Sequence, residues 1–384
     1  MTTVLLLTKK AKTEFDKEVK EATVQKQQYD FIYNADKAIK TELKKENYTV
    51  EDLKALNSTN ALINQVKPRF IQILTNVPKA EFDEQIKEAK EHFDNQLAYN
   101  LNLEFDGRKV LGDNIDDLTD TKYGNNNVIG PKKDGALHGT HVAGIIAQVR
   151  NNGLGGDGVA NNVEILTVRA VPDGDEYDKD IALGIRYAVD NGAKVINGSF
   201  GKSYSPHKEW VYEALKYAAS KDVLVVLAAG NEGTDLDTED RFPNDRDASG
   251  EISNNVIKIG ALAPKYGSEM VATFSNYGTQ DVDVFAPGVQ IYATIPDNQY
   301  KYLQGTSMAS PNVAGVAALI RSYYPTLTAP QVKQILMESG IPTNTEVILA
   351  GEKGNKRSFS QASKSGKMVN AYNALLMAEK MAKK

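Results

Sequence analysis

A serine, a histidine and an asparagine stand in three separate motifs whose residue types suit acyl transfer. Ser307 lies among small residues in GTSMASPNVAG, His138 opens HGTHVAG, and Asn231 lies in AAGNEG. A serine hydroxyl becomes a nucleophile when a base lies beside it, and a helix N-terminus favours the negative charge that develops nearby. An asparagine amide can donate to the oxygen that turns negative in a tetrahedral intermediate. Together these groups indicate acyl transfer, and so peptide cleavage.

Each motif also has a purely structural interpretation. Ser307 could cap the helix that VAGVAALI predicts, with Pro311 in the first turn, where a missing N–H costs little. Asn231 could be a turn asparagine, because N-E-G is turn chemistry. A lipase-type elbow is excluded, since Ala309 replaces its second glycine and no histidine follows His207.

The remaining histidines fit other roles better than catalysis. His138 and His141 form an HxxH pair, but the HExxH metal signature is absent and the sequence has no cysteine. We therefore expect no metal site here and expect His141 to pack inside its helix. His92 and His207 lie in charged helical stretches and are predicted at the surface.

Composition is that of an ordinary globular protein. The 384 residues are 41% hydrophobic and 25% charged, and the net charge of −5 argues against a nucleic-acid partner. No apolar run approaches the roughly 18 residues of a membrane-spanning helix, so no membrane span is expected. The first residues lack the pattern of a secretory signal. The absence of cysteine does not fix the compartment.

The second part of the chain alternates apolar runs with helical patterns, which predicts an α/β fold with a doubly wound, mostly parallel sheet. Helices are expected at 178–192 and 207–221, a helix capped by Thr328 follows, and a last helix starts near Val369; residues 345–368 are predicted as loop. The functional site of such a sheet lies beyond the carboxyl ends of its strands, where Asn231 falls. The expected strands are 163–171, 193–200, 222–230, 255–262 and 282–288.

Residues 1–98 form a distinct α-helical region, followed by a second domain over 99–384. This first region is rich in Lys and Glu, has almost no glycine, and carries apolar residues at spacings of three, four or seven, which predicts three or four amphipathic helices. Thr49 with Asp52 resembles a capping box, and Pro78 suits a helix start. The region is either a solvated helical bundle or a partner-binding arm.

The three motifs, in the order His, Asn, Ser, make this chain similar to the subtilisin-like serine peptidases, the subtilases, over roughly residues 100–344. The resemblance implies a subtilisin-like fold with His138 as general base, Ser307 as nucleophile and Asn231 as oxyanion donor. It also implies that an extended peptide or protein substrate pairs with the cleft strand. The amino-acid sequences of several loops are most similar to those of subtilases from Bacteroidetes-type bacteria that carry a helical insert. The implied substrate-binding residues are Ser199, Phe200, Gly201 and Gly230.

The resemblance also calls for an aspartate in a D-[ST]-G motif upstream of the histidine, and the sequence has none. We therefore expect a subtilase without its first strand, with an unpaired position in the sheet and weak or absent activity, since losing the orienting aspartate costs about 10⁴-fold. A non-catalytic peptide-binding scaffold and a helical adaptor are the alternatives. The upstream aspartates that could serve instead are Asp106, Asp113, Asp116, Asp117 and Asp120.

The sequence indicates less about cofactors and about the cellular compartment than about the fold. No cofactor is expected, although the resemblance raises a calcium site near Asn151–Gly156, without ligands that can be assigned. Relatives of this type suggest a secreted or cell-envelope protein, whereas the sequence itself leaves localisation open.

Overall fold

The computed structural model describes residues 2–171, 176–247 and 249–383. The chain forms two compact units, a helical one that runs to Val110 and an α/β one that begins at Leu111. Each unit is described by itself below. Among the described residues, every helix is too short or too polar to cross a bilayer.

The helical unit consists of one long helix and several shorter ones. They are α1 (Thr2–Leu43), α2 (Val50–Ala55), α3 (Ala61–Leu74), α4 (Lys79–Asn95) and a π-helical turn, η1 (Gln96–Asn100). The predicted capping box at Thr49 is present, because Asp52 N donates to Thr49 Oγ1 over 3.2 Å and Thr49 N donates to Asp52 Oδ2 over 3.0 Å. Pro78 directly precedes α4, as predicted.

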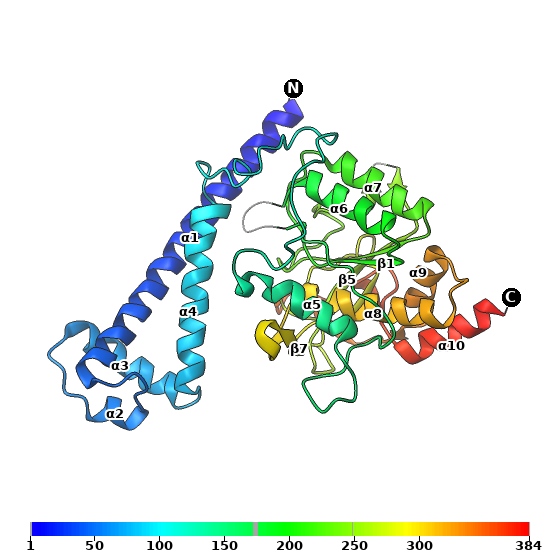
Figure 1. Ribbon diagram of the computed structural model, residues 1–384. Coiled ribbons are helices and arrows are strands. Elements are labelled where there is room, and N and C mark those ends of the chain that lie inside the picture. The colour runs from blue at the N-terminus through cyan, green and yellow to red at the C-terminus, as the bar shows by residue number, and fades with distance from the viewer. Residues whose placement is uncertain (1, 172–175, 248, 384) are drawn as a thin grey trace. The chain divides into compact units, whose positions relative to one another are not determined.

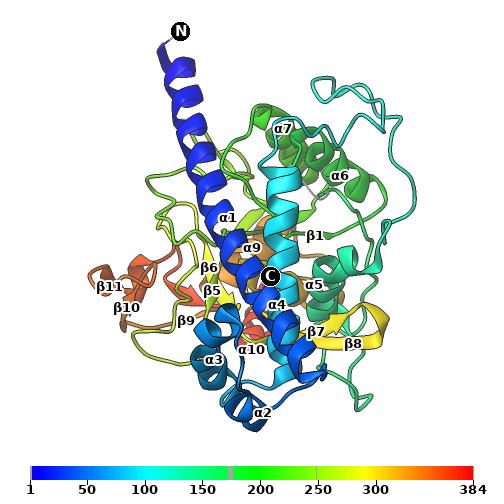
Figure 2. The same cartoon turned by 90° about the vertical axis from the view of Figure 1, so that its left-hand side faces the viewer.

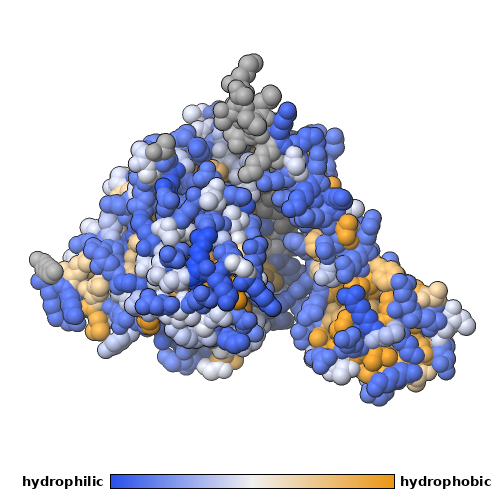
Figure 3. All heavy atoms as spheres, turned by 180° about the vertical axis from the view of Figure 1, so that it is seen from behind, coloured by the Kyte–Doolittle hydropathy of each residue, from blue (hydrophilic) through white to orange (hydrophobic). Residues whose placement is uncertain are grey.

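Helices α1 and α4 lie side by side along much of their length, as both views of the ribbon show (Figures 1 and 2). Ion pairs such as Lys90 with Asp30, 2.7 Å apart, link their charged faces. Where α2 and α3 pack, half-buried apolar side chains remain visible at the surface (Figure 3). The buried core of this unit is Ala35, Ile39, Tyr48, Leu53, Ile63, Val66, Phe70, Phe82 and Ile86.

A six-stranded sheet with the order β1-β2-β5-β6-β12-β9 forms the centre of the α/β unit. All neighbours pair in parallel except β12 and β9, which are antiparallel. This confirms the predicted mostly parallel sheet. The strands are β1 (Val195–Gly198), β2 (Leu224–Ala228), β5 (Val256–Leu262), β6 (Val284–Pro287), β9 (Ile341–Pro342) and β12 (Lys367–Met368).

Helices cover both faces of this sheet (Figure 1). Successive side chains of a strand point to opposite faces, so Val225 and Leu227 pack under one helical layer while Leu224 and Val226 pack under the other. This double coverage explains why the central strands are almost continuously apolar. The first layer is α6 (Asp178–Asp190) and α7 (Lys208–Ser220); the second is α8 (Thr306–Tyr323), α9 (Ala329–Glu338) and α10 (Ala371–Ala382).

Two expectations about the sheet were wrong. The segment 163–171 forms no strand, and its Ile165, Leu166 and Val168 side chains are exposed. A strand is defined by its ladder of hydrogen bonds, and no described strand pairs with this segment, so its β-prone sequence has no partner. The stretch 345–368, expected as loop, instead holds the hairpin of β10 (Glu346–Ile348) and β11 (Lys356–Ser358), a 3₁₀ turn, η4 (Phe359–Gln361), and strand β12.

Short hairpins complete the unit. Strands β7 (Ile291–Ile295) and β8 (Gln299–Leu303) flank the 3₁₀ turn η3 (Pro296–Asn298), and this hairpin packs beside α5 (Leu137–Ala147), as Figure 2 shows. Helix α5 follows a 3₁₀ turn, η2 (Lys133–Ala136). A second hairpin joins β3 (Arg246–Asp247) to β4 (Gly250–Glu251).

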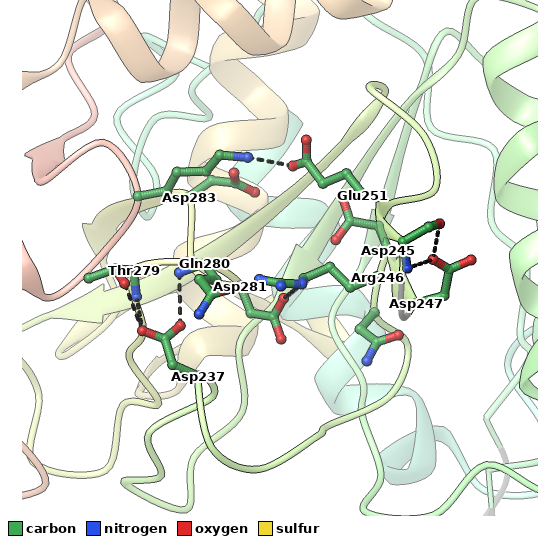
Figure 4. A network of polar contacts seen from close by, with 12 residues as sticks. Asp237, Asp245, Arg246, Asp247, Glu251, Thr279, Gln280, Asp281 and Asp283 are labelled. Atoms are coloured by element: carbon green, nitrogen blue, oxygen red, sulfur yellow. Dashed lines mark hydrogen bonds and ion pairs between the residues drawn. The ribbon is translucent and has the colours of Figure 1, made fainter.

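Buried charged side chains gather near the amino end of β6, where the β3–β4 hairpin, β5 and α9 meet (Figure 4). Lys258 is 1% exposed, and its ammonium has no hydrogen-bond partner. Asp245, Asp281 and Asp283 each leave one buried carboxylate oxygen without a hydrogen-bond partner. Burial raises the pKa of Asp283 to about 6, although the ammonium of Lys333, 3.8 Å away, acts to lower it.

The raised pKa of Asp283 predicts an unusual pH dependence of stability. Because the folded protein holds this proton between pH about 4 and 6 while the unfolded chain releases it, the free energy of unfolding should gain about 2 kcal/mol from this group as pH falls from 7.5 to 4.5. D283N should lose that gain. Urea unfolding of both proteins across this range measures the difference, with D134N, at an exposed aspartate, as the control. Parallel curves for wild type and D283N would contradict the assignment.

Candidate active site

Asn231 follows β2 at the carboxyl edge of the sheet, as the sequence predicts. Its side-chain oxygen accepts hydrogen bonds from Thr306 N over 2.8 Å and from Thr306 Oγ1 over 3.0 Å. The backbone N–H of Thr306 can only donate, so the amide of Asn231 must present its oxygen to α8. Its Nδ2 group therefore does not bind Thr306 and stays available to another acceptor.

Ser307 lies in the first turn of α8 and is half-buried. The helix begins after Gly305, whose φ of 147° lies in a region that favours glycine. Ser307 makes no capping bond of its own; the first amide of the helix is instead satisfied by Asn231 from another element. The structural alternative for Ser307, helix capping, is therefore wrong, and its hydroxyl lies at the positive end of the helix dipole.

The sequence predicts Pro311 in the first turn of its helix, but α8 begins at Thr306, so Pro311 falls in the second turn. A residue at this position would normally donate its N–H to the carbonyl of Ser307, four residues earlier, but proline has none. Ser199 Oγ donates to that carbonyl instead, over 2.8 Å. The proline thus frees the Ser307 carbonyl to bind the segment that follows β1.

A short chain of polar side chains extends this connection into the core. Ser310 Oγ donates to Asn197 Oδ1 over 2.7 Å, and Asn197 Nδ2 donates to Ser199 Oγ over 2.9 Å. The Ser307 hydroxyl donates in turn to the backbone oxygen of Ser199 over 3.3 Å. Of the expected cleft residues, Ser199 therefore contacts Ser307 at the start of α8, whereas Phe200 packs against the core cluster of α6 and α7.

His138 lies in the first turn of α5, a helix that packs against α8. Its side chain is exposed, and it makes no hydrogen bond with Ser307 or with any other described residue. Although solvent reaches the ring, the surrounding protein atoms lower its pKa, mainly by desolvation and secondarily through the nearby His141. The imidazole of His138 therefore stays neutral to a lower pH than a free imidazole.

His141 is fully buried and packs inside the fold, as predicted. Its Nε2 lies 3.1 Å from the carbonyl oxygen of Ile291 and 3.0 Å from that of Lys301. Carbonyl oxygens only accept, so Nε2 carries the proton and ties α5 to both strands of the β7–β8 hairpin. Burial lowers the pKa of His141, which keeps the ring neutral.

Thr306, Asn197, Ser310 and Asn276 take part in this site but were not singled out from the sequence. The hydroxyl of Thr306 accepts a hydrogen bond from Gly230 N over 3.1 Å, which brings the loop after β2 onto α8. The only signals for these residues were their places inside GTSMASP, VINGSFG and ATFSNYG. Small polar residues in such motifs also suit turns, so the sequence alone did not show what they bind.

The sequence model of the subtilase family matches residues 39–365 of this chain. The chain belongs to the subtilase family. It is 49% identical over 186 residues to a thermophilic serine proteinase of Bacillus sp. (strain AK1), covering 48% of this chain but only 42% of that protein. It is 40% identical over 205 residues to subtilisin DY of Bacillus licheniformis, covering 53% of this chain and 70% of that enzyme.

A solved structure of the subtilase cytotoxin SubAB assembly shares the fold. It aligns with a TM-score of 0.53 and 28% identity, over 65% of this chain and 79% of that one. These likenesses confirm the predicted subtilisin-like fold, whose helices enclose a mostly parallel sheet.

Within the described part of the α/β unit, no hydrogen bond or ion pair joins Asp113, Asp116, Asp117 or Asp120 to His138. These aspartates have other partners: Asp116 Oδ1 lies 2.7 Å from Nε2 of His207, and Asp113 binds the buried ammonium of Lys179 over 3.0 Å. The others are held in the same local way: Asp120 lies 3.6 Å from the Lys179 ammonium, Asp106 accepts from the amides of Arg108 and Lys109, and Asp117 accepts from the amide of Thr119.

Mutation can test whether the Ser199 hydroxyl takes the place of the missing Pro311 N–H as donor to the Ser307 carbonyl. S199A should leave the buried Ser307 carbonyl without its donor and cost about 1–3 kcal/mol in the free energy of unfolding. P311A restores a backbone N–H that can reach the same carbonyl, so the S199A/P311A double variant should recover part of that loss. Urea unfolding of the four proteins measures the coupling. Strictly additive effects would show that the two positions do not share this carbonyl.

Proposed function

We propose that this chain is a serine endopeptidase of the subtilisin type. The observation that carries the proposal is the bond between Asn231 and α8, because it turns the Asn231 amide so that Nδ2 is free beside Ser307. A free amide donor next to a hydroxyl at a helix N-terminus suits an oxyanion site. Membership of the subtilase family supports the same activity.

In the proposed reaction, Ser307 Oγ attacks the carbonyl carbon of a peptide bond while His138 accepts the hydroxyl proton. The oxygen that becomes negative is stabilised by Asn231 Nδ2 and by the backbone N–H of Ser307. His138 then passes its proton to the leaving amine, which departs, and water hydrolyses the acyl-enzyme by the reverse sequence. For this step the Ser307 hydroxyl must turn from the Ser199 carbonyl toward the imidazole.

The proposed substrate is an extended peptide or protein segment. Ser199, Phe200 and Gly201 follow an edge strand, and their backbone can pair with a peptide in the manner of an added strand. Gly230 directly precedes Asn231 in the chain, and we propose that its backbone also borders the bound substrate.

A non-catalytic peptide-binding scaffold is the second candidate. Two observations favour it: the Ser307 hydroxyl bonds to Ser199 rather than to His138, and no described carboxylate bonds to His138. A fluorophosphonate probe separates the candidates, since only an activated serine reacts with it.

The proposed catalytic roles predict a different activity for each of several variants. Wild type should be labelled by the fluorophosphonate and should cleave a peptide anilide, whereas S307A should do neither. N231A should keep Ser307 but lower kcat by about 10²–10³-fold, since one oxyanion donor is lost. S322A, a hydroxyl loss on the exposed face of α8, is the control and should match wild type. Equal labelling of wild type and S307A, or none of either, would contradict the proposed activity.

The lowered pKa of His138 predicts the pH profile. A base must be neutral to accept the proton, so kcat/KM should rise with pH and reach its plateau with an apparent pKa below the roughly 6.5 of a free imidazole. Rates of anilide cleavage from pH 4.5 to 8.5 measure it. An apparent pKa well above 6.5 would mean that a negative charge, not desolvation, dominates at the imidazole.

A further inference from the structure

The loop that carries Asn231 is held by a buried asparagine from another segment. Asn276 lies between two residues that form isolated β-bridges, Val271 and Tyr277, and is 0% exposed. Its Nδ2 donates to Ala229 O over 2.8 Å and to Glu232 Oε2 over 2.6 Å. Its Oδ1 accepts from Glu232 N over 3.2 Å and from Thr234 N over 2.8 Å.

These contacts enclose Asn231 on both sides in sequence. Ala229 precedes it by two residues and Glu232 follows it directly, and both are fixed by the same amide. The backbone N–H of Asn276 also donates to Gly230 O over 3.1 Å. All four hydrogen-bonding positions of the amide are used, so no smaller side chain can satisfy the loop.

Asn276 fits tightly against the loop. A Cβ atom at Gly230 would lie 2.4 Å from Asn276 Nδ2, and the φ of Gly230 is +103°, so only glycine allows the two segments to approach this closely. Asn276 is itself anchored to the sheet, because Ser275 Oγ accepts from Ala261 N and donates to Asn276 O, each over 2.9 Å. A continuous set of hydrogen bonds thus runs from β5 to the Asn231 loop.

We propose that Asn276 is a positioning residue for the reaction: it holds the 229–234 loop so that Asn231 Nδ2 meets the developing oxyanion. Asn276 touches no reacting atom and acts only through Asn231. The inference rests on the proposed function, and it assigns to a buried residue part of the transition-state stabilisation credited to Asn231. Donors of this kind contribute most when they need no rearrangement during the reaction.

A role confined to stability would have a different signature. Such a residue would lower the free energy of unfolding without a selective effect on turnover, and its effect would be the same whether or not Asn231 is present. A positioning residue lowers kcat with little change in KM, and its effect disappears once the group it positions is removed.

The experiment compares peptide-anilide kinetics of wild type, N276A, N231A and N231A/N276A. We expect N276A to lower kcat about 10–100-fold with KM within about 3-fold, and the double variant to be no slower than N231A. The matched control is N255A: Asn255 is also 0% exposed and donates to the carbonyl of Val223 over 2.7 Å, but it lies at the opposite end of β5. Its kcat should stay within about 3-fold of wild type.

Hydrogen exchange of the peptide covering 229–235 is measured on the same proteins. The amides of Glu232 and Thr234 should exchange at least about 10-fold faster in N276A than in wild type or N255A, because they lose their acceptor. Unchanged exchange there, a kcat of N276A equal to that of N255A, or an undiminished N276A effect in the N231A background would each overturn the positioning role while leaving the proposed function intact. A wild-type chain without turnover or probe labelling would instead overturn the proposed function, and this inference with it.

Discussion

The hydrogen bond from Thr306 N to Asn231 Oδ1 is the contact on which the site depends. It joins the carboxyl end of β2 to the first turn of α8, satisfies a helix amide that has no partner within the helix, and fixes which way the Asn231 amide faces. Without it, the Asn231 amide could face either way, and the start of α8 would be held to the sheet mainly by the bonds between Ser307 and Ser199. The same bond therefore serves the fold and the proposed chemistry.

Around this bond, several backbone groups that regular secondary structure leaves unpaired are bound by side chains from other segments. Pro311 frees the Ser307 carbonyl for Ser199, the start of α8 leaves an amide for Asn231, and the turn after β2 leaves amides for Asn276. Buried backbone groups need hydrogen-bond partners, so each of these unpaired groups is bound by a polar side chain from elsewhere in the chain. The result is a site whose parts are held from several elements at once.

The sequence predicted the layers of the fold better than the contacts of the site. The apolar runs that became β1, β2, β5 and β6 were found because burial on both faces leaves a clear pattern. The run at 163–171 is also rich in β-branched residues, but it pairs with no strand among the described residues, and pairing is a tertiary property that composition does not encode. The short strands of 345–368 are polar and only two or three residues long, so they left no periodic signal.

Motif chemistry predicted roles for Ser307, His138 and Asn231, but it could not find Asn276 or the role of Pro311, because these depend on which carbonyl or amide lies unpaired in space. The catalytic assignments, the division at residue 98 and the likeness to Bacteroidetes-type relatives remain predictions.

A crystal structure of this chain after reaction with a fluorophosphonate tests the central claim most directly. The account predicts a phosphorus atom bonded to Ser307 Oγ, with one phosphoryl oxygen accepting from both Asn231 Nδ2 and Ser307 N. An adduct whose oxygens turn away from Asn231, or Asn231 presenting its oxygen to the adduct, would contradict it.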